Sequence, residues 1–145
     1  ESKNVSGHLF LSLTHQKVLQ ALRQADYLSP KYHVVIANPP YMGGKGMNST
    51  LANWLKKYYS ESSSDLMTAF MMRITELTPL GGFAAIVTLD AWMFLSTYEK
   101  LRGAFASLHS YDSLVHIGWN AFPDGHVYNR GVAFVVRIRL PDRTD

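Results

Sequence analysis

The chain has 145 residues, of which 47% are hydrophobic and 17% charged, which excludes a disordered or low-complexity protein and suits a single folded domain. The 14 lysines and arginines exceed the 11 acidic residues by a net charge of +3, which permits a polyanionic partner without requiring one. The absence of cysteine excludes disulfides, cysteine-ligated zinc and thiolate nucleophiles. No apolar run suits a membrane-spanning helix and the first residues are polar, so we expect a soluble, cytoplasmic protein.

The first part of the chain predicts a helix, a strand and a long loop. Apolar residues at helical spacing predict a helix from Thr14 to Leu28, which Ser29-Pro30 ends. The β-branched run His33–Ala37 predicts a buried strand that stops at two prolines. Residues 41–64 are rich in glycine, lysine, asparagine and serine, and we expect a loop there with one short helix near residues 50–59.

The rest of the chain predicts two more helices and three more strands. The first helix should begin behind serine N-caps with Asp65 at its positive end, and the second in a capping box that runs from Ser96 to Glu99. The three expected strands are Phe83–Leu89, Leu114–Trp119 and Val132–Ile138. The last two are joined by a segment too short for a helical crossover, so they should form an antiparallel hairpin. The sequence therefore predicts an α/β fold whose sheet is mainly parallel and ends in that hairpin.

The segment Asn38–Tyr41 follows the first predicted strand, where open α/β sheets bind their ligands. Asn38 offers an amide oxygen, and Pro39 and Pro40 stiffen the backbone carbonyls around it. Tyr41 adds a flat stacking face just beyond. We expect Asn38 Oδ1 and the Pro39 carbonyl to accept hydrogen bonds from the two N–H groups of a planar amine. This frees the lone pair of the amine to attack an activated methyl group.

This motif resembles the catalytic motif of S-adenosylmethionine-dependent methyltransferases of the N6-adenine DNA class. The longer blocks Val35–Asn48 and Ala91–Arg102 are similar to the PglX-type methyltransferases of BREX phage-defence systems. The resemblance extends from about Tyr32 to Ile138, and it implies the second half of a Rossmann-like methyltransferase core. It further implies S-adenosylmethionine as cofactor, double-stranded DNA with a flipped adenine as substrate, and other phage-defence components as possible partners.

The resemblance also suggests residues around the motif that hold the substrate. It implies that Phe122, followed by Pro123, stacks on the second face of the flipped base opposite Tyr41. Lys45 lies in a window from Lys31 to Ser60 that has no acidic residue, and we expect it to meet DNA phosphates. We expect Asn38 to touch the methyl end of the cofactor as well. The six histidines show no metal-ligand spacing, so no metal site is expected.

Two parts of such an enzyme are missing from the sequence. We find no Gly-rich turn after a first strand with a following acidic residue, and no target-recognition region after the hairpin. Residues 1–145 are therefore expected to be a partial catalytic domain that is inactive alone. Its open sheet edge should favour pairing with a second copy.

Three other functions remain open from the sequence. Release-factor methyltransferases, which methylate a protein glutamine amide, use a similar Asn-Pro-Pro-Tyr motif. N4-cytosine methylation poses the same chemical problem, although that class more often begins the motif with serine. A non-catalytic module that binds nucleic acid or a partner protein is the alternative of a different kind.

Overall fold

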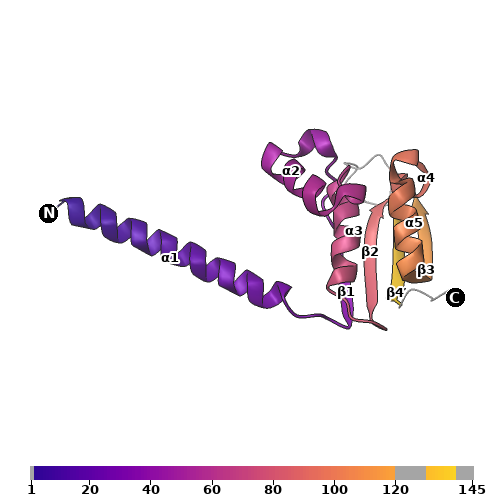
Figure 1. Cartoon of the computed structure of the whole chain (residues 1–145), viewed down its shortest axis with the longest axis horizontal. Helices are drawn as coiled ribbons and strands as arrows, with labels where there is room; N and C mark the ends of the chain where they lie inside the picture. Colours follow the sequence, from indigo (N-terminus) through magenta and orange to yellow (C-terminus); the bar gives the residue numbers. More distant parts are fainter. Residues whose placement is uncertain (1, 120–129, 140–145) are drawn as a thin grey trace. The chain divides into compact units, whose positions relative to one another are not determined.

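The computed structural model describes residues 2–119 and 130–139, and of residues 2–10 it describes the backbone only. The chain divides into two compact units, Glu1–Lys31 and Tyr32–Asp145. The first unit holds one long helix, α1 (Ser2–Leu28), which begins well before the predicted start (Figure 1). No helix in the described part of the chain has the length and apolar character needed to cross a membrane.

The second unit is built on a four-stranded sheet in the order β1-β2-β4-β3. Its strands are β1 (Val34–Ala37), β2 (Phe83–Leu89), β3 (His109–Gly118) and β4 (Gly131–Ile138). β1 pairs parallel with β2, and β4 runs antiparallel to both β2 and β3. Three strands therefore share one direction, and their carboxyl ends lie at one edge of the sheet.

The predicted hairpin is present, but its first strand is longer than expected. β3 begins at His109 rather than Leu114. The sequence pattern missed its first half because the residues there are polar and their side chains are largely exposed. An edge strand with one wet face does not show the continuous apolar run from which the other strands were predicted. β4 shows that run clearly, and Val132, Phe134 and Val136 on it are buried.

The helices of this unit lie between the strands in the chain. They are α2 (Ser49–Tyr58), α3 (Leu66–Glu76), α4 (Ala91–Phe94) and α5 (Glu99–Leu108), with short 3-10 turns η1 (Gly44–Gly46), η2 (Ser60–Ser62) and η3 (Ser96–Tyr98). Figure 1 shows α3 and α5 against one face of the sheet. Met71 and Phe105 from these helices meet Ile86 and Phe134 from the sheet in a single core. The opposite face of the sheet is exposed within this unit, with Ile36 at 77% and a shallow hollow of about 170 Å³ beside it.

Two predicted helix starts are wrong in detail. Ser96 lies in the η3 turn and makes no capping bond; α5 begins at Glu99, after Tyr98, which is buried in the core. Packing of that tyrosine overrides the capping-box pattern. For α3, Asp65 itself is the N-cap, with Oδ1 accepting from Met67 N at 2.9 Å. The Ser62 and Ser63 hydroxyls instead donate to the carbonyls of Tyr59 and Ser60.

Candidate active site

The predicted motif leaves the sheet at the carboxyl end of β1, beside the end of β2. Asn38 and Pro40 are exposed, Pro39 is buried, and Tyr41 is half-buried against the core. In the described part of the chain β1 pairs only with β2, so it forms one edge of the sheet. The motif therefore combines a fixed backbone with an amide side chain that remains open to solvent.

Tyr41 and Asn38 are joined directly. The Tyr41 hydroxyl donates to Asn38 Oδ1 at 3.1 Å and lies 3.5 Å from the carbonyl oxygen of Val87 on β2. Burial raises the pKa of Tyr41, which further favours the protonated hydroxyl that donates this bond. An amide oxygen has two lone pairs, and the tyrosine uses one. The arrangement therefore orients Asn38 Oδ1 and still leaves it able to accept from a second amine.

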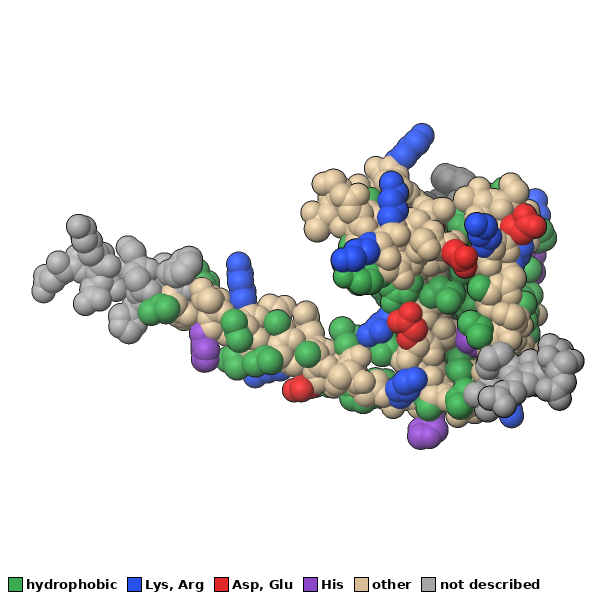
Figure 2. Space-filling model, in the orientation of Figure 1, with side chains coloured by type: hydrophobic (Ala, Val, Ile, Leu, Met, Phe, Trp, Pro, Cys, Tyr) green, Lys and Arg blue, Asp and Glu red, His purple; other side chains and the backbone are tan. Residues whose placement is uncertain are grey.

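Basic side chains surround the loop that follows the motif. Lys45 lies on the η1 turn, and Lys56 and Lys57 lie in the last turn of α2; all three are exposed. Figure 2 shows Lys and Arg side chains projecting around α2. Trp54 and Tyr58 are also exposed on α2, with ring centroids 5.2 Å apart. Lys57 Nζ lies 4.9 Å from the centroid of the Tyr58 ring, so α2 offers a cation and an aromatic face together.

Phe122 and Pro123 lie outside the described residues, so their predicted place opposite Tyr41 stays a prediction. The residues on either side of the segment 120–129, which contains them, are described. Trp119 follows β3 and Arg130 precedes β4 at the carboxyl edge, with the Arg130 guanidinium 5.0 Å from the Trp119 ring. The chain therefore leaves and re-enters the sheet at the same edge as the motif.

Sequence reasoning missed a polar pair at this edge. Asp90 directly follows β2 and occupies the N-cap position of α4. Its carboxylate makes no capping bond there, but lies 2.8 Å from His116 Nε2 on β3. Twenty-six positions separate the two residues. Because no local spacing links residues so far apart, only the strand order β2-β4-β3 reveals the pair.

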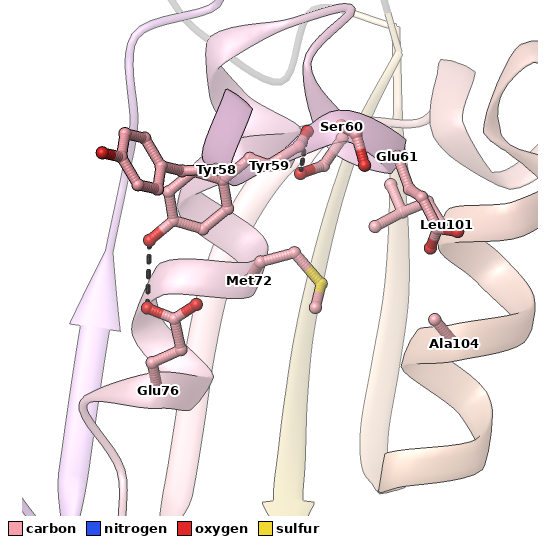
Figure 3. Close-up of a pocket in the computed structure, with 9 residues that line it drawn as sticks. Tyr58, Tyr59, Ser60, Glu61, Met72, Glu76, Leu101 and Ala104 are labelled. Atoms are coloured by element: carbon pink, nitrogen blue, oxygen red, sulfur yellow. Dashed lines mark hydrogen bonds between the residues drawn. The ribbon is translucent and has the colours of Figure 1, made fainter. Parts of the chain in front are cut away.

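A separate hollow of about 180 Å³ lies among η2, α3 and α5 (Figure 3). The Tyr59 hydroxyl donates to Glu76 Oε2 at 3.0 Å across it, and Met72 and Leu101 line it. Burial, and then the Glu76 carboxylate, raise the pKa of Tyr59. No motif residue lines this hollow. Among the described residues, no group of three His, Asp or Glu side chains has an arrangement that could hold a metal ion.

The sequence matches the model of the Eco57I restriction-modification methylase family over residues 9–122. The chain belongs to this family. It is 42% identical over 118 residues to the adenine-specific methyltransferase BrxX of Escherichia coli O9:H4 (strain HS), which covers 81% of the chain. It is 39% identical over 142 residues to the adenine-specific methyltransferase PglX of Lacticaseibacillus casei (strain Zhang), which covers 94% of the chain. The predicted family resemblance is thereby confirmed.

The fold of this Eco57I-family chain is confirmed by a solved structure. A protein of Listeria monocytogenes described as a class I S-adenosylmethionine-dependent methyltransferase superposes with a TM-score of 0.58 at 16% identity. The match covers 78% of this chain and 33% of that one. The chain spans 10% of the length of BrxX and 12% of the length of PglX. The α/β fold is therefore part of a methyltransferase core.

Proposed function

We propose that the protein is a DNA methyltransferase that transfers a methyl group from S-adenosylmethionine to the N6 amino group of adenine. Family membership supports the reaction class, and the names of BrxX and PglX support adenine and a role in phage defence. The observation that carries the proposal is the Tyr41 hydroxyl bound to Asn38 Oδ1 at the carboxyl end of β1. This hydrogen bond orients the exposed Asn38 Oδ1, which supports its role as the acceptor that holds the target amine.

The amino group of adenine is a poor nucleophile because its lone pair is delocalised into the ring. Asn38 Oδ1 and the Pro39 carbonyl accept hydrogen bonds from its two N–H groups. These two bonds favour a pyramidal nitrogen and free the lone pair. The Pro39 and Pro40 rings hold those acceptors in a fixed direction, so little reorganisation is needed during the reaction. No protein nucleophile takes part, in keeping with a chain that has no cysteine.

When bound, S-adenosylmethionine supplies an activated methyl group on a positively charged sulfur. Asn38 fits the methyl end of that cofactor, because its exposed side chain offers an uncharged acceptor. We propose that residues 1–145 contribute the second half of the catalytic domain. The Gly-rich cofactor motif and the target-recognition region would then lie elsewhere in a longer polypeptide, which the small share of BrxX and PglX covered by this chain supports.

We propose that two aromatic residues and the basic loop hold the DNA. Chemistry on the base needs the base outside the double helix, where aromatic side chains can hold it. Tyr41 stacks on one face of the flipped adenine and Phe122 on the other. Lys45, Lys56 and Lys57 meet backbone phosphates beside it, and their exposure supports this role. Pairing of two copies through the β1 edge and contacts with other defence proteins stay predictions.

The experiment that tests this function identifies the product. The full-length protein is incubated with isotope-labelled S-adenosylmethionine and unmethylated double-stranded DNA, which is then digested to nucleosides and analysed by mass. Labelled N6-methyl-2′-deoxyadenosine is the expected product. Labelled N4-methyl-2′-deoxycytidine would show that cytosine, not adenine, is the target base. Label on a protein glutamine instead of DNA would contradict the proposal.

A further inference from the structure

The residue immediately after the motif is held on both of its backbone groups. Met42 N donates to Asp65 Oδ1 at 3.2 Å, and Met42 O accepts from Leu66 N at 2.9 Å. Gly43 and Asp65 form an antiparallel bridge next to these bonds, and Gly44 N donates to Ser64 O at 3.2 Å. The first residue after Tyr41 is therefore hydrogen-bonded to the start of α3 and does not belong to an unrestrained loop.

A single carboxylate oxygen makes this link and begins the helix as well. Asp65 Oδ1 accepts from Met42 N and from Met67 N, the second bond being the N-cap of α3. The Thr68 hydroxyl donates to the Asp65 carbonyl at 2.7 Å, which fixes the backbone behind the side chain. Met67 and Met71 then bury α3 in the core. Asp65 thus connects a rigid, packed helix to the exit of the motif.

The charge of Asp65 also reaches the core side of this junction. Tyr98, buried before α5, has a pKa raised by burial first and by the negative charge of Asp65 second. The half-buried carboxylate therefore lies within electrostatic reach of a packed side chain.

We propose that Asp65 is a positioning residue of the methyl-transfer site, acting through the backbone of Met42 on Tyr41 and through Tyr41 on Asn38. The proposal rests on the proposed function. Releasing the Met42 N–H removes one of the two hydrogen bonds that hold the backbone next to Tyr41, and the Tyr41 hydroxyl is the group that orients Asn38 Oδ1. Small displacements of an acceptor from its reacting geometry cost about 10- to 100-fold in rate.

Three variants of the full-length protein separate positioning from helix capping. Asp65→Ser keeps an N-cap hydroxyl but is too short to reach both Met42 and Met67. Asp65→Asn keeps an Oδ1 acceptor of the same reach. Asn48→Ser is the matched control, because Asn48 caps α2 through Leu51 N at 2.9 Å and has no bond to the motif.

The readout is the single-turnover methylation rate at saturating DNA and cofactor, with cofactor affinity and thermal stability measured beside it. We expect Asp65→Ser to lose about 10-fold or more in rate at unchanged cofactor affinity, and Asp65→Asn and Asn48→Ser to stay within about threefold of wild type. A rate for Asp65→Ser equal to that of Asn48→Ser would overturn the proposal. So would an equal loss in Asp65→Asn, because the acceptor geometry would then not be what matters.

Amide hydrogen exchange tests the link without depending on activity. In the full-length protein we expect the Met42 amide to exchange faster in Asp65→Ser than in wild type, while the core of α3 around Met71 keeps its protection. Unchanged exchange at Met42 would overturn the role of Asp65. If the wild-type protein makes no methylated DNA, the proposed function fails, and the exchange experiment still decides whether Asp65 holds the motif's exit.

Discussion

Two neighbouring strands end at the same edge of the sheet, and the segments that follow them use their polar groups in opposite ways. After β1, the backbone is fastened by Asp65 while the Asn38 amide remains exposed. After β2, Trp92 is 2% exposed and its indole N–H donates to the buried Thr88 hydroxyl at 2.9 Å. The first segment is rigid with an open acceptor, which suits chemistry; the second is closed by packing, which suits stability. Substitutions in the two segments should therefore have different consequences.

The largest effect is expected from Asn38→Ala. Loss of Oδ1 removes an acceptor for the target amine, so the methylation rate of the full-length protein should fall about 100-fold or more. The affinity for S-adenosylmethionine, measured by equilibrium binding, should stay within about threefold of wild type, because Asn38 acts mainly on the amine. Equal losses of rate and cofactor affinity would show that this role is assigned wrongly.

Phe122→Ala extends the comparison to the segment that follows β3. Stacking on a flipped base contributes about 1–3 kcal/mol per base, so affinity for target DNA should fall about 5- to 150-fold. The single-turnover rate at saturating DNA should change much less than the affinity. Filter binding or fluorescence anisotropy with target DNA measures the affinity, and an unchanged value would exclude Phe122 from base capture.

Trp92→Phe should show the opposite signature to Asn38→Ala. A smaller aromatic ring remains, but the Thr88 hydroxyl at 0% exposure loses its indole partner, which should cost about 1–3 kcal/mol in free energy of unfolding. Denaturant unfolding measures the change. We expect no comparable loss of methylation rate per folded molecule. A stable variant with a large loss of rate would place part of the chemistry after β2 instead.

Tyr41→Phe sharpens the account of the first segment. The ring keeps its stacking face and loses the hydroxyl that binds Asn38 Oδ1 at 3.1 Å. A neutral hydrogen bond contributes about 0.5–1.5 kcal/mol, so the rate should fall about 3- to 10-fold while DNA affinity stays close to wild type. Single-turnover kinetics and a DNA titration separate the two quantities, and a fall in affinity alone would contradict the orienting role.

The smallest effect concerns stability and pH at the start of β3. Burial lowers the pKa of His109, against a smaller opposing effect of the Leu108 backbone. The folded state therefore favours the neutral ring, so stability is lost as pH falls below about 6.5 toward the lowered pKa. His109→Phe should reduce this loss between pH 7.5 and 5.5 in thermal unfolding. An equally steep pH dependence in the variant would assign the effect to other groups.

Much of the fold follows from local pattern in the sequence. The strand Phe83–Leu89 is predicted at its observed bounds, and the predicted strand Val132–Ile138 lacks only the first residue of β4. Both are found because buried strands have continuous apolar runs in the sequence. The motif is also found at the end of its predicted strand, but the prediction that this strand is buried is wrong: Val34 is 58% and Ile36 77% exposed on β1. The capping box at Ser96 fails because packing of Tyr98 decides where α5 begins.

The contacts that shape the site follow from long-range arrangement instead. Met42 and Asp65 are 23 positions apart, and Asp90 and His116 are 26 apart. Asp65 and Asp90 each have an ordinary local explanation, because each occupies the N-cap position of a helix. Only the order of the strands and the return of α3 to the end of β1 bring the partners together, so no spacing rule applied to the sequence finds them.

The most direct test of the central claim compares N6-methyladenine formed per folded molecule by wild-type, Asn38→Ala and Trp92→Phe full-length proteins in one single-turnover experiment. We expect the product to be lost in Asn38→Ala and retained in Trp92→Phe. Similar losses in both variants, or retention in Asn38→Ala, would contradict the assignment of the chemistry to the segment after β1.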